Sequence, residues 1–193
     1  IWRYDPIFFN GQYSMEYHCK YFEVLASKLA DYTEKCTVSF MDLYRNTERN
    51  VKTLNIVKDT YEMQVELLQR FVEIAKEHGL YIDTCAEIGD FHNIGVEHAH
   101  CIDRERIERI GEFKLSVDKD TNQRAECGCV ASIDIGAYNT CKNGCLYCYA
   151  NYSSNTVEKN FVMHNPKSPL LFGEIDDTDV IKERKVKSLI DNQ

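Results

Sequence analysis

The sequence predicts an α/β protein in the form of a partial (β/α) TIM-like barrel with parallel strands, followed by a cysteine-rich loop and an irregular C-terminal tail. Short β-rich runs alternate with helical periodicity, which is typical of parallel βαβ units. The alternation itself leaves an open doubly wound sheet and part of a barrel as alternatives. No GxGxxG or Walker sequence follows a predicted strand, so a Rossmann or P-loop nucleotide site is not expected.

The elements follow from local signals. We expect the first strand to end at Asp5-Pro6, because proline cannot donate to a continuing ladder. Ser14 is a suitable N-cap for the first helix, and Asp59 with Glu62 forms a capping-box pattern for the clearest helix, which Gly79 should end. The predicted strands are residues 1–5, 36–41, 80–85 and 130–135. The predicted helices are residues 14–31, 59–78 and 103–110.

Polar residues stand at or just past the predicted strand ends. They are Arg3, Asp5, Asp42, Cys85 and Glu87. For one isolated acid, a helix cap or a surface charge is the simpler interpretation. Polar residues at successive strand ends favour a barrel, because these positions converge on its C-terminal mouth, where active sites are built.

Composition limits the classes of function. The 193 residues carry a net charge of -8, which argues against a broad surface for nucleic acid or anionic membranes. No apolar run is long enough to span a bilayer, and a signal peptide is not expected. Nine cysteines without an export signal predict metal binding in a reducing cytoplasm rather than a disulfide framework.

Two regions are expected. Residues 1–136 are predicted to form the C-terminal portion of a barrel, with the cysteine loop and tail of residues 137–193 packed on the same domain. The chain starts as though inside a strand, with Ile1-Trp2-Arg3 directly before Tyr4-Asp5. We therefore expect it to be the C-terminal part of a longer protein whose first barrel strands are missing here.

Three cysteines near the end of the chain form the most specific motif. Cys141, Cys145 and Cys148 are separated by three and two residues. Soft thiolates hold iron–sulfur clusters and zinc, and three of them can bind a [4Fe–4S] cluster while one iron stays open. A structural zinc site takes four ligands, which makes a zinc knuckle the weaker alternative. This spacing resembles the signature of the radical S-adenosylmethionine (SAM) superfamily.

A wider resemblance covers the chain from Trp2 to about Pro169. It rests on segments that occur in this order: Trp2–Pro6, Ser39–Tyr44, Cys85–Glu87, Cys101–Asp103, Gln123–Arg124, Cys127–Cys129, Ser132–Gly136 and Cys141–Asn151. Together they resemble a bacterial and archaeal family of unknown function whose C-terminal cysteines are similar to the radical SAM cluster site. The family resemblance implies a TIM-barrel-like fold. The similarity of Cys141, Cys145 and Cys148 to the radical SAM signature implies reductive cleavage of SAM bound to the open iron. It also implies an unknown small-molecule or nucleotide substrate and a reductant such as ferredoxin or flavodoxin.

Under this hypothesis several residues would contact SAM or substrate. Tyr147 would pack beside the cluster or the adenine, with an ordinary core aromatic as the alternative. Arg3 could hold a carboxylate or phosphate through two hydrogen bonds, or could pair with a neighbouring acid. The acidic candidates for substrate or SAM hydroxyls are Asp134, Glu87, Asp42 and Asp5.

Four further cysteines could form a second site. They are Cys85, Cys101, Cys127 and Cys129, which would close a zinc site or hold a second cluster. Their spacing lacks zinc-finger regularity, and free cysteines are often simply buried, so both interpretations stay open. The alternative function for the whole chain is a non-catalytic metal-binding or electron-transfer module, with iron–sulfur or structural zinc.

Overall fold

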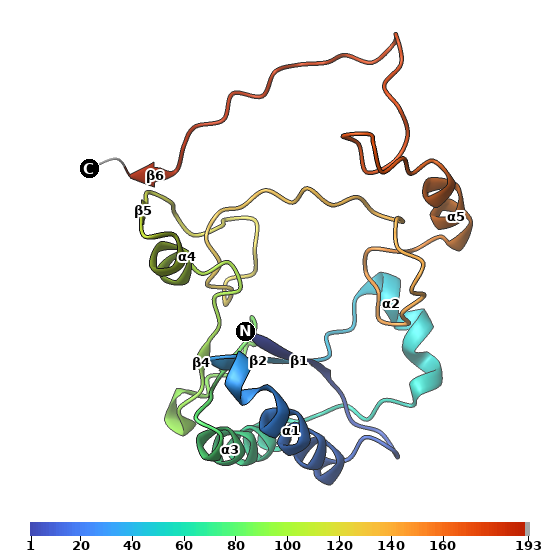
Figure 1. Cartoon of the computed structure of the whole chain (residues 1–193). Helices are drawn as coiled ribbons and strands as arrows, with labels where there is room; N and C mark the ends of the chain where they lie inside the picture. Colours follow the sequence, from blue (N-terminus) through green and yellow to red (C-terminus); the bar gives the residue numbers. More distant parts are fainter. Residues whose placement is uncertain (192–193) are drawn as a thin grey trace. The chain divides into compact units, whose positions relative to one another are not determined.

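The structure is a computed structural model that describes residues 1–191, apart from the side chains of residues 45 and 46. The strands are β1 (Trp2–Ile7), β2 (Lys35–Phe40), β3 (Tyr81–Thr84), β4 (Glu97–His98), β5 (Lys114–Leu115) and β6 (Ile190–Asp191). The α-helices are α1 (Met15–Leu29), α2 (Arg45–Val51), α3 (Tyr61–Glu77), α4 (Arg104–Gly111) and α5 (Ser154–Val162) (Figure 1). Short 3-10 helices cover Ala30–Tyr32, Lys52–Leu54 and His92–Ile94.

The chain divides into two compact units. The first contains Ile1–Asp42, Leu54–Ser132 and the end of the chain from Leu189. The second contains Leu43–Thr53 and Ile133–Ser188, and therefore holds α2, the cysteine loop and α5.

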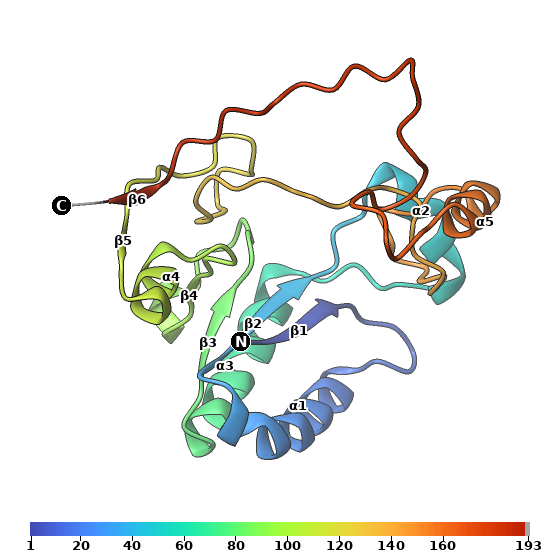
Figure 2. The ribbon, with the colours of Figure 1, turned by 45° about the horizontal axis from the view of Figure 1, so that its top comes forward.

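The first unit is built on a parallel sheet with the strand order β1-β2-β3-β4. Helices α1 and α3 connect successive strands and lie on the same face of this sheet (Figure 2). A mixed α/β fold with parallel strands is therefore confirmed. Within residues 1–191 the four-stranded sheet does not close into a barrel, so the partial TIM-like barrel stays a prediction.

The apolar core lies between the sheet and the two helices. Ser14 caps α1 as predicted, and its hydroxyl accepts from the amide of Tyr17 at 3.2 Å. The rings of Phe22 in α1 and Phe71 in α3 are stacked with centroids 3.9 Å apart. Both side chains are fully buried, and burying an aromatic side chain contributes on the order of 2–3 kcal/mol. This packing fixes the helix-covered face and leaves the other face of the sheet for polar side chains.

Two predicted boundaries are wrong. Strand β1 continues through Asp5-Pro6 to Ile7, because it is an edge strand with a register irregularity there, and such positions tolerate proline. Helix α3 is capped by Thr60 rather than Asp59, which instead accepts a hydrogen bond from the side chain of Gln64. Gly79 does adopt the left-handed conformation expected after this helix, with φ of 68°.

The strand predicted at residues 130–135 does not form. Within this segment only Val130 makes a β-bridge, to Lys119. Ile133 and Ile135 are 57% and 86% exposed, so their apolar side chains have no buried face to occupy. Alternating isoleucines therefore predicted a strand that finds no adjacent strand among the described residues.

Candidate functional site

The face of the sheet opposite α1 and α3 carries polar side chains. Arg3, Thr37 and Asp83 are direct neighbours in the register of β1, β2 and β3, so they share this face. Asp83 is buried, accepts a hydrogen bond from Thr37 Oγ1 at 2.6 Å and forms an ion pair with buried Lys35. Because a buried charge without a partner is costly, this pair holds the β2–β3 backbone in one arrangement.

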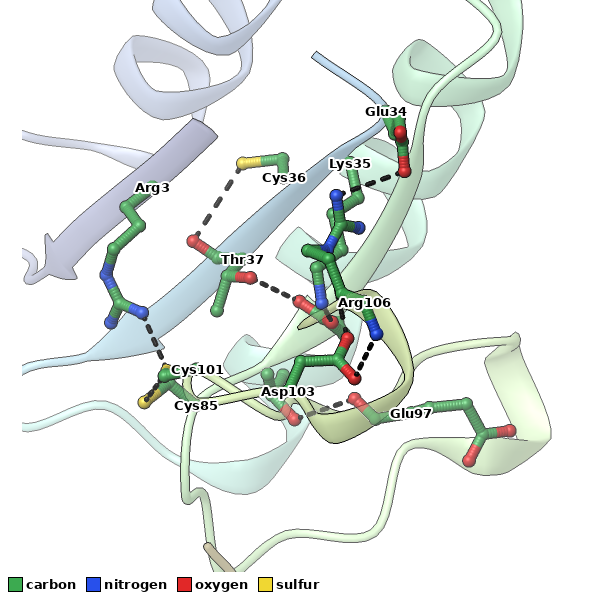
Figure 3. Close-up of polar contacts among 12 residues, drawn as sticks. Arg3, Glu34, Lys35, Cys36, Thr37, Cys85, Glu97, Cys101, Asp103 and Arg106 are labelled. Atoms are coloured by element: carbon green, nitrogen blue, oxygen red, sulfur yellow. Dashed lines mark hydrogen bonds and ion pairs between the residues drawn. The ribbon is translucent and has the colours of Figure 1, made fainter. Parts of the chain in front are cut away.

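The second feature of this face is a pair of thiols beyond the ends of β3 and β4. The Sγ atoms of Cys85 and Cys101 lie 3.4 Å apart. Arg3 Nη1 donates to Cys101 Sγ at 2.9 Å, and Arg3 Nε donates to Asp5 at 2.8 Å. Figure 3 shows the guanidinium of Arg3 pointing at the two sulfurs. We name Arg3, Asp5, Cys85 and Cys101 the strand-end site.

The two thiols of the strand-end site differ in acidity. The hydrogen bond from Cys101, followed by the contact with Arg3, lowers the pKa of Cys85 to about 6. The interaction with Cys85 and burial raise the pKa of Cys101. A positive group beside a partly exposed cysteine favours the thiolate, which is the nucleophilic and metal-binding form. The contacts therefore favour the thiolate form of Cys85 over that of Cys101.

Cys127 and Cys129 lie beside this site. Their side chains form a small buried cluster with Ala86, against which Cys85 packs. Cys129 Sγ accepts from the backbone amide of Ile102 at 3.2 Å, next to Cys101 in the chain. The structure therefore brings the four predicted second-site cysteines together as two adjacent pairs.

Gly128, between Cys127 and Cys129, allows a close approach that sequence reasoning missed. A Cβ atom at Gly128 would lie 2.4 Å from His100 Cδ2 and 2.5 Å from His100 Nε2, so only glycine admits the imidazole here. The sequence places His98 and His100 directly before Cys101 without showing which side chain faces the cysteine turn. In the structure, the side chain that faces this turn is that of His100.

The other acidic residues predicted for the site in the first unit also have hydrogen-bond or ion-pair partners. Glu87 Oε1 accepts from the amide of Phe40 at the end of β2, at 2.9 Å. Burial raises the pKa of Glu87 to about 7, and the negative charge of Asp42 adds to this rise. Asp42 forms an ion pair with Arg124 at 2.5 Å. Asp5, Asp42 and Glu87 are thus paired with groups of the same compact unit.

In the second unit, Cys141, Cys145 and Cys148 lie on a loop that is closed at its base. Buried Asn139, with φ of 56°, is the anchor. Its Oδ1 accepts from the amides of Tyr152 and Ser153 at 2.9 and 3.1 Å, and its amide donates to Ala150. We name residues 140–151 the cysteine loop. Its conformation depends on this base and on Gly144, which has φ of 67°.

The thiols of the cysteine loop are accessible. Cys141 and Cys145 are exposed, Cys148 is half-buried, and all three are free cysteines. Cys141 and Cys145 line a cavity of about 640 Å³, a volume within the range of ligand pockets. Arg49 and the N-terminal residues of α5, Ser153 and Ser154, line the same cavity. A helix N-terminus and an arginine together favour an anionic group there.

The other predicted contacts in this unit are local. The ring of Tyr147 lies 6.2 Å from that of Tyr44, and Tyr147 is half-buried. Asp134 is exposed and its Oδ1 accepts from the amide of Gly136 at 2.7 Å. Lys142 pairs with Glu158 of α5 at 2.8 Å, which connects the cysteine loop to a helix that the sequence analysis did not predict.

The thiols of the two units are not arranged as a complete metal site among residues 1–191. Within the part of the chain that the structure describes, no three or more His, Cys, Asp or Glu side chains are placed together so that they could hold a metal ion. The donor set of the cysteine loop still fits a soft metal, because three free thiols on one loop are the ligands that iron–sulfur clusters use. Binding would require their sulfurs to converge.

Fold and sites together define an α/β protein with thiols at strand ends and on a closed loop. A family profile described as a domain of unknown function, DUF1848, matches residues 1–150. The chain belongs to this family, and the match includes both the strand-end site and the motif Cys141–Cys148. Comparison with curated proteins and with solved structures finds no match. Among residues 1–191 no helix has the length and apolarity needed to cross a membrane.

Proposed function

We propose that this protein is an iron–sulfur protein of the radical SAM type, in which Cys141, Cys145 and Cys148 hold a [4Fe–4S] cluster. The observation that carries the proposal is the placement of three free thiols, at the spacing of that superfamily, on a loop beside a cavity of about 640 Å³. The chemistry supplied by such a cluster is one-electron reduction of bound SAM.

The residues around the loop have distinct tasks in this proposal. Asn139 holds the two ends of the loop together, so ligand binding orders a segment whose ends are already fixed. The ammonium of Lys142 is held by Glu158 and lies 3.9 Å from the ring centroid of Phe161, so it is anchored to α5. Arg49 and the N-terminus of α5 attract a carboxylate such as that of SAM to the cavity.

The partners and further cofactor contacts stay predictions. They include a small-molecule or nucleotide substrate and a ferredoxin or flavodoxin reductant. A second cluster or zinc at the four other cysteines is the alternative to chemistry between the thiols of Cys85 and Cys101. A cytoplasmic location and a partial TIM-like barrel also stay predictions. The roles of Tyr147, Asp134, Glu87, Asp42, Asp5 and Arg3 toward SAM or substrate belong to the same hypothesis.

The second candidate function is a metal-binding or electron-transfer module without catalysis. The exposure of Cys141 and Cys145 favours it, since an exposed cluster exchanges electrons readily but does not exclude water. The two candidates differ in what happens to SAM.

Anaerobic reconstitution with iron and sulfide, followed by SAM and dithionite, separates them. The proposal predicts about four irons per chain and formation of 5′-deoxyadenosine, both lost in Cys145→Ala. A cluster that leaves SAM intact supports the electron-transfer module. Stoichiometric zinc without iron contradicts both iron–sulfur functions.

A further inference from the structure

We propose that Cys85 and Cys101 form a thiol–disulfide exchange site that takes an aliphatic disulfide as its substrate. This activity is separate from the cysteine loop, which contributes no residue to it. It rests on the arrangement of two thiols and one guanidinium at the strand-end site.

The two sulfurs are close to bonding distance. Cys85 Sγ and Cys101 Sγ lie 3.4 Å apart, whereas the bond length of a disulfide is about 2.05 Å. An approach of about 1.4 Å, within reach of side-chain rotation, would join them. The backbone on both sides is fixed, because the amide of Cys85 donates to Val38 O at 2.8 Å and that of Ala99 donates to Thr84 O at 2.7 Å.

The neighbouring charge favours exchange chemistry over metal binding. Arg3 Nη1 lies 2.9 Å from Cys101 Sγ and belongs to the same contact network as Cys85. A guanidinium beside a thiolate stabilises the anion and opposes the approach of a second cation. Asp5 orients Arg3 through its hydrogen bond from Nε at 2.8 Å.

The two sulfurs differ in their exposure to solvent. Cys101 is exposed and Cys85 is half-buried, so a disulfide can reach the pair from solvent. Buried Cys36 contrasts with both, because it is fully buried in the core and burial raises its pKa. The same chain therefore contains an accessible pair and an inert reference thiol.

The exchange balances without a further reagent. The thiolate of Cys85 attacks one sulfur of the substrate disulfide, a mixed disulfide forms, and the departing thiolate takes a proton from water. Cys101 then loses its proton to solvent and its thiolate attacks Cys85 Sγ, which releases the second substrate thiolate, and this thiolate also takes a proton from water. The substrate gains two electrons and two protons, and Cys85 and Cys101 are oxidised to one disulfide.

The test uses the full chain in a series of reduced and oxidised glutathione buffers, followed by alkylation and peptide mass spectrometry. We expect a Cys85–Cys101 disulfide, two hydrogens lighter than the dithiol, at least tenfold more abundant than any other pair, while Cys36 stays reduced. In Cys101→Ser, glutathione should stay attached to Cys85. The matched variant Cys19→Ser, which changes a half-buried free cysteine of α1 outside the strand-end site, should still form the disulfide.

A second measurement distinguishes a chemical role of Arg3 from a structural one. Arg3→Gln should slow disulfide formation about tenfold at pH 7, and a higher pH should restore the rate, because loss of the cation raises the pH at which the thiolate forms. Arg3→Lys should retain most of the rate. Thiols that stay reduced in the most oxidising buffer would overturn the proposal. So would a disulfide mainly to Cys127 or Cys129, or one zinc or iron per chain lost in Cys85→Ser.

Discussion

The strand-end site and the cysteine loop present thiols in opposite ways. At the strand ends, the sulfurs of Cys85 and Cys101 are already 3.4 Å apart, and Arg3 donates a hydrogen bond to Cys101. On the cysteine loop, three free thiols stand on a segment whose base is hydrogen-bonded. The first arrangement suits chemistry between two sulfurs, and the second leaves sulfurs free to converge on a ligand.

The difference follows from what holds each backbone. Residues at the ends of parallel strands are positioned by the sheet. Near the thiol pair, Asp83 of β3 contacts both Lys35 and Thr37 of β2, which connects the two strands. The cysteine loop has no β-ladder hydrogen bonds. Three hydrogen bonds made by Asn139 hold its two ends instead. Each region should therefore fail through a different substitution.

The largest expected effect is on the support of the strand-end site. Asp83→Ala leaves buried Lys35 without its partner, and such losses cost about 3–5 kcal/mol. Urea denaturation of the variant should show this decrease in the free energy of unfolding. Glu66→Ala, which breaks an exposed ion pair to Arg70, is the matched control and should be indistinguishable from the wild type. If both variants were equally stable, the contact between Asp83 and Lys35 would not be what holds the sheet and the thiol pair in place.

The next effect concerns the base of the cysteine loop. Asn139→Ala removes the acceptor for two amides, at about 1–3 kcal/mol for each group left unsatisfied. Amide exchange of Tyr152 and Ser153 should become faster, and iron uptake should decrease. Asn139→Asp keeps the acceptor next to the N-terminus of α5 and should retain protection. Unchanged exchange in Asn139→Ala would show that the loop is closed by other contacts.

The rate at which Cys85 of the strand-end site is alkylated should depend on pH. Because the folded chain lowers the pKa of Cys85 to about 6, its alkylation should be half-maximal near that pH. An ordinary thiol ionises near pH 8.5. Cys101→Ser removes the first cause of the shift and should move the midpoint upward. A midpoint above pH 8 in the wild type would contradict the proposed contact with Arg3 and Cys101.

The smallest effect is at Glu87. Its folded pKa of about 7 exceeds the unfolded value of 4.5, so the folded chain binds more protons between these values. The stability from this group is complete below pH 4.5 and is lost as the pH rises through 7. Glu87→Gln keeps an acceptor for the Phe40 amide and should flatten this part of the stability profile. An unchanged slope would assign the pH dependence to another group.

Sequence reasoning found most of the first unit because its signals are local. Ser14, Gly79 and Asp103 mark helix ends, and the caps and the left-handed turn follow from backbone chemistry alone. The strand at residues 130–135 failed because alternation does not reveal whether an adjacent strand exists. The sequence analysis missed helix α5, which follows the N-cap Ser153. Its helical pattern is short and lies between polar residues.

The candidate sites divide in the same way. The spacing of Cys141, Cys145 and Cys148 is visible in one segment, so the motif could be found without a structure. The contact between Cys85 and Cys101 joins two strand ends and depends on register, which no local pattern specifies. The packing of His100 on Gly128 is likewise a long-range close approach.

The most direct test compares iron binding in two matched variants after anaerobic reconstitution with iron and sulfide. One variant replaces Cys141, Cys145 and Cys148 with alanine, and the other replaces Cys85 and Cys101 with serine. The account predicts about four irons per chain in the wild type and in the second variant, and none in the first. Iron retained by the first variant, or lost only from the second, would contradict the assignment of the cluster to the cysteine loop.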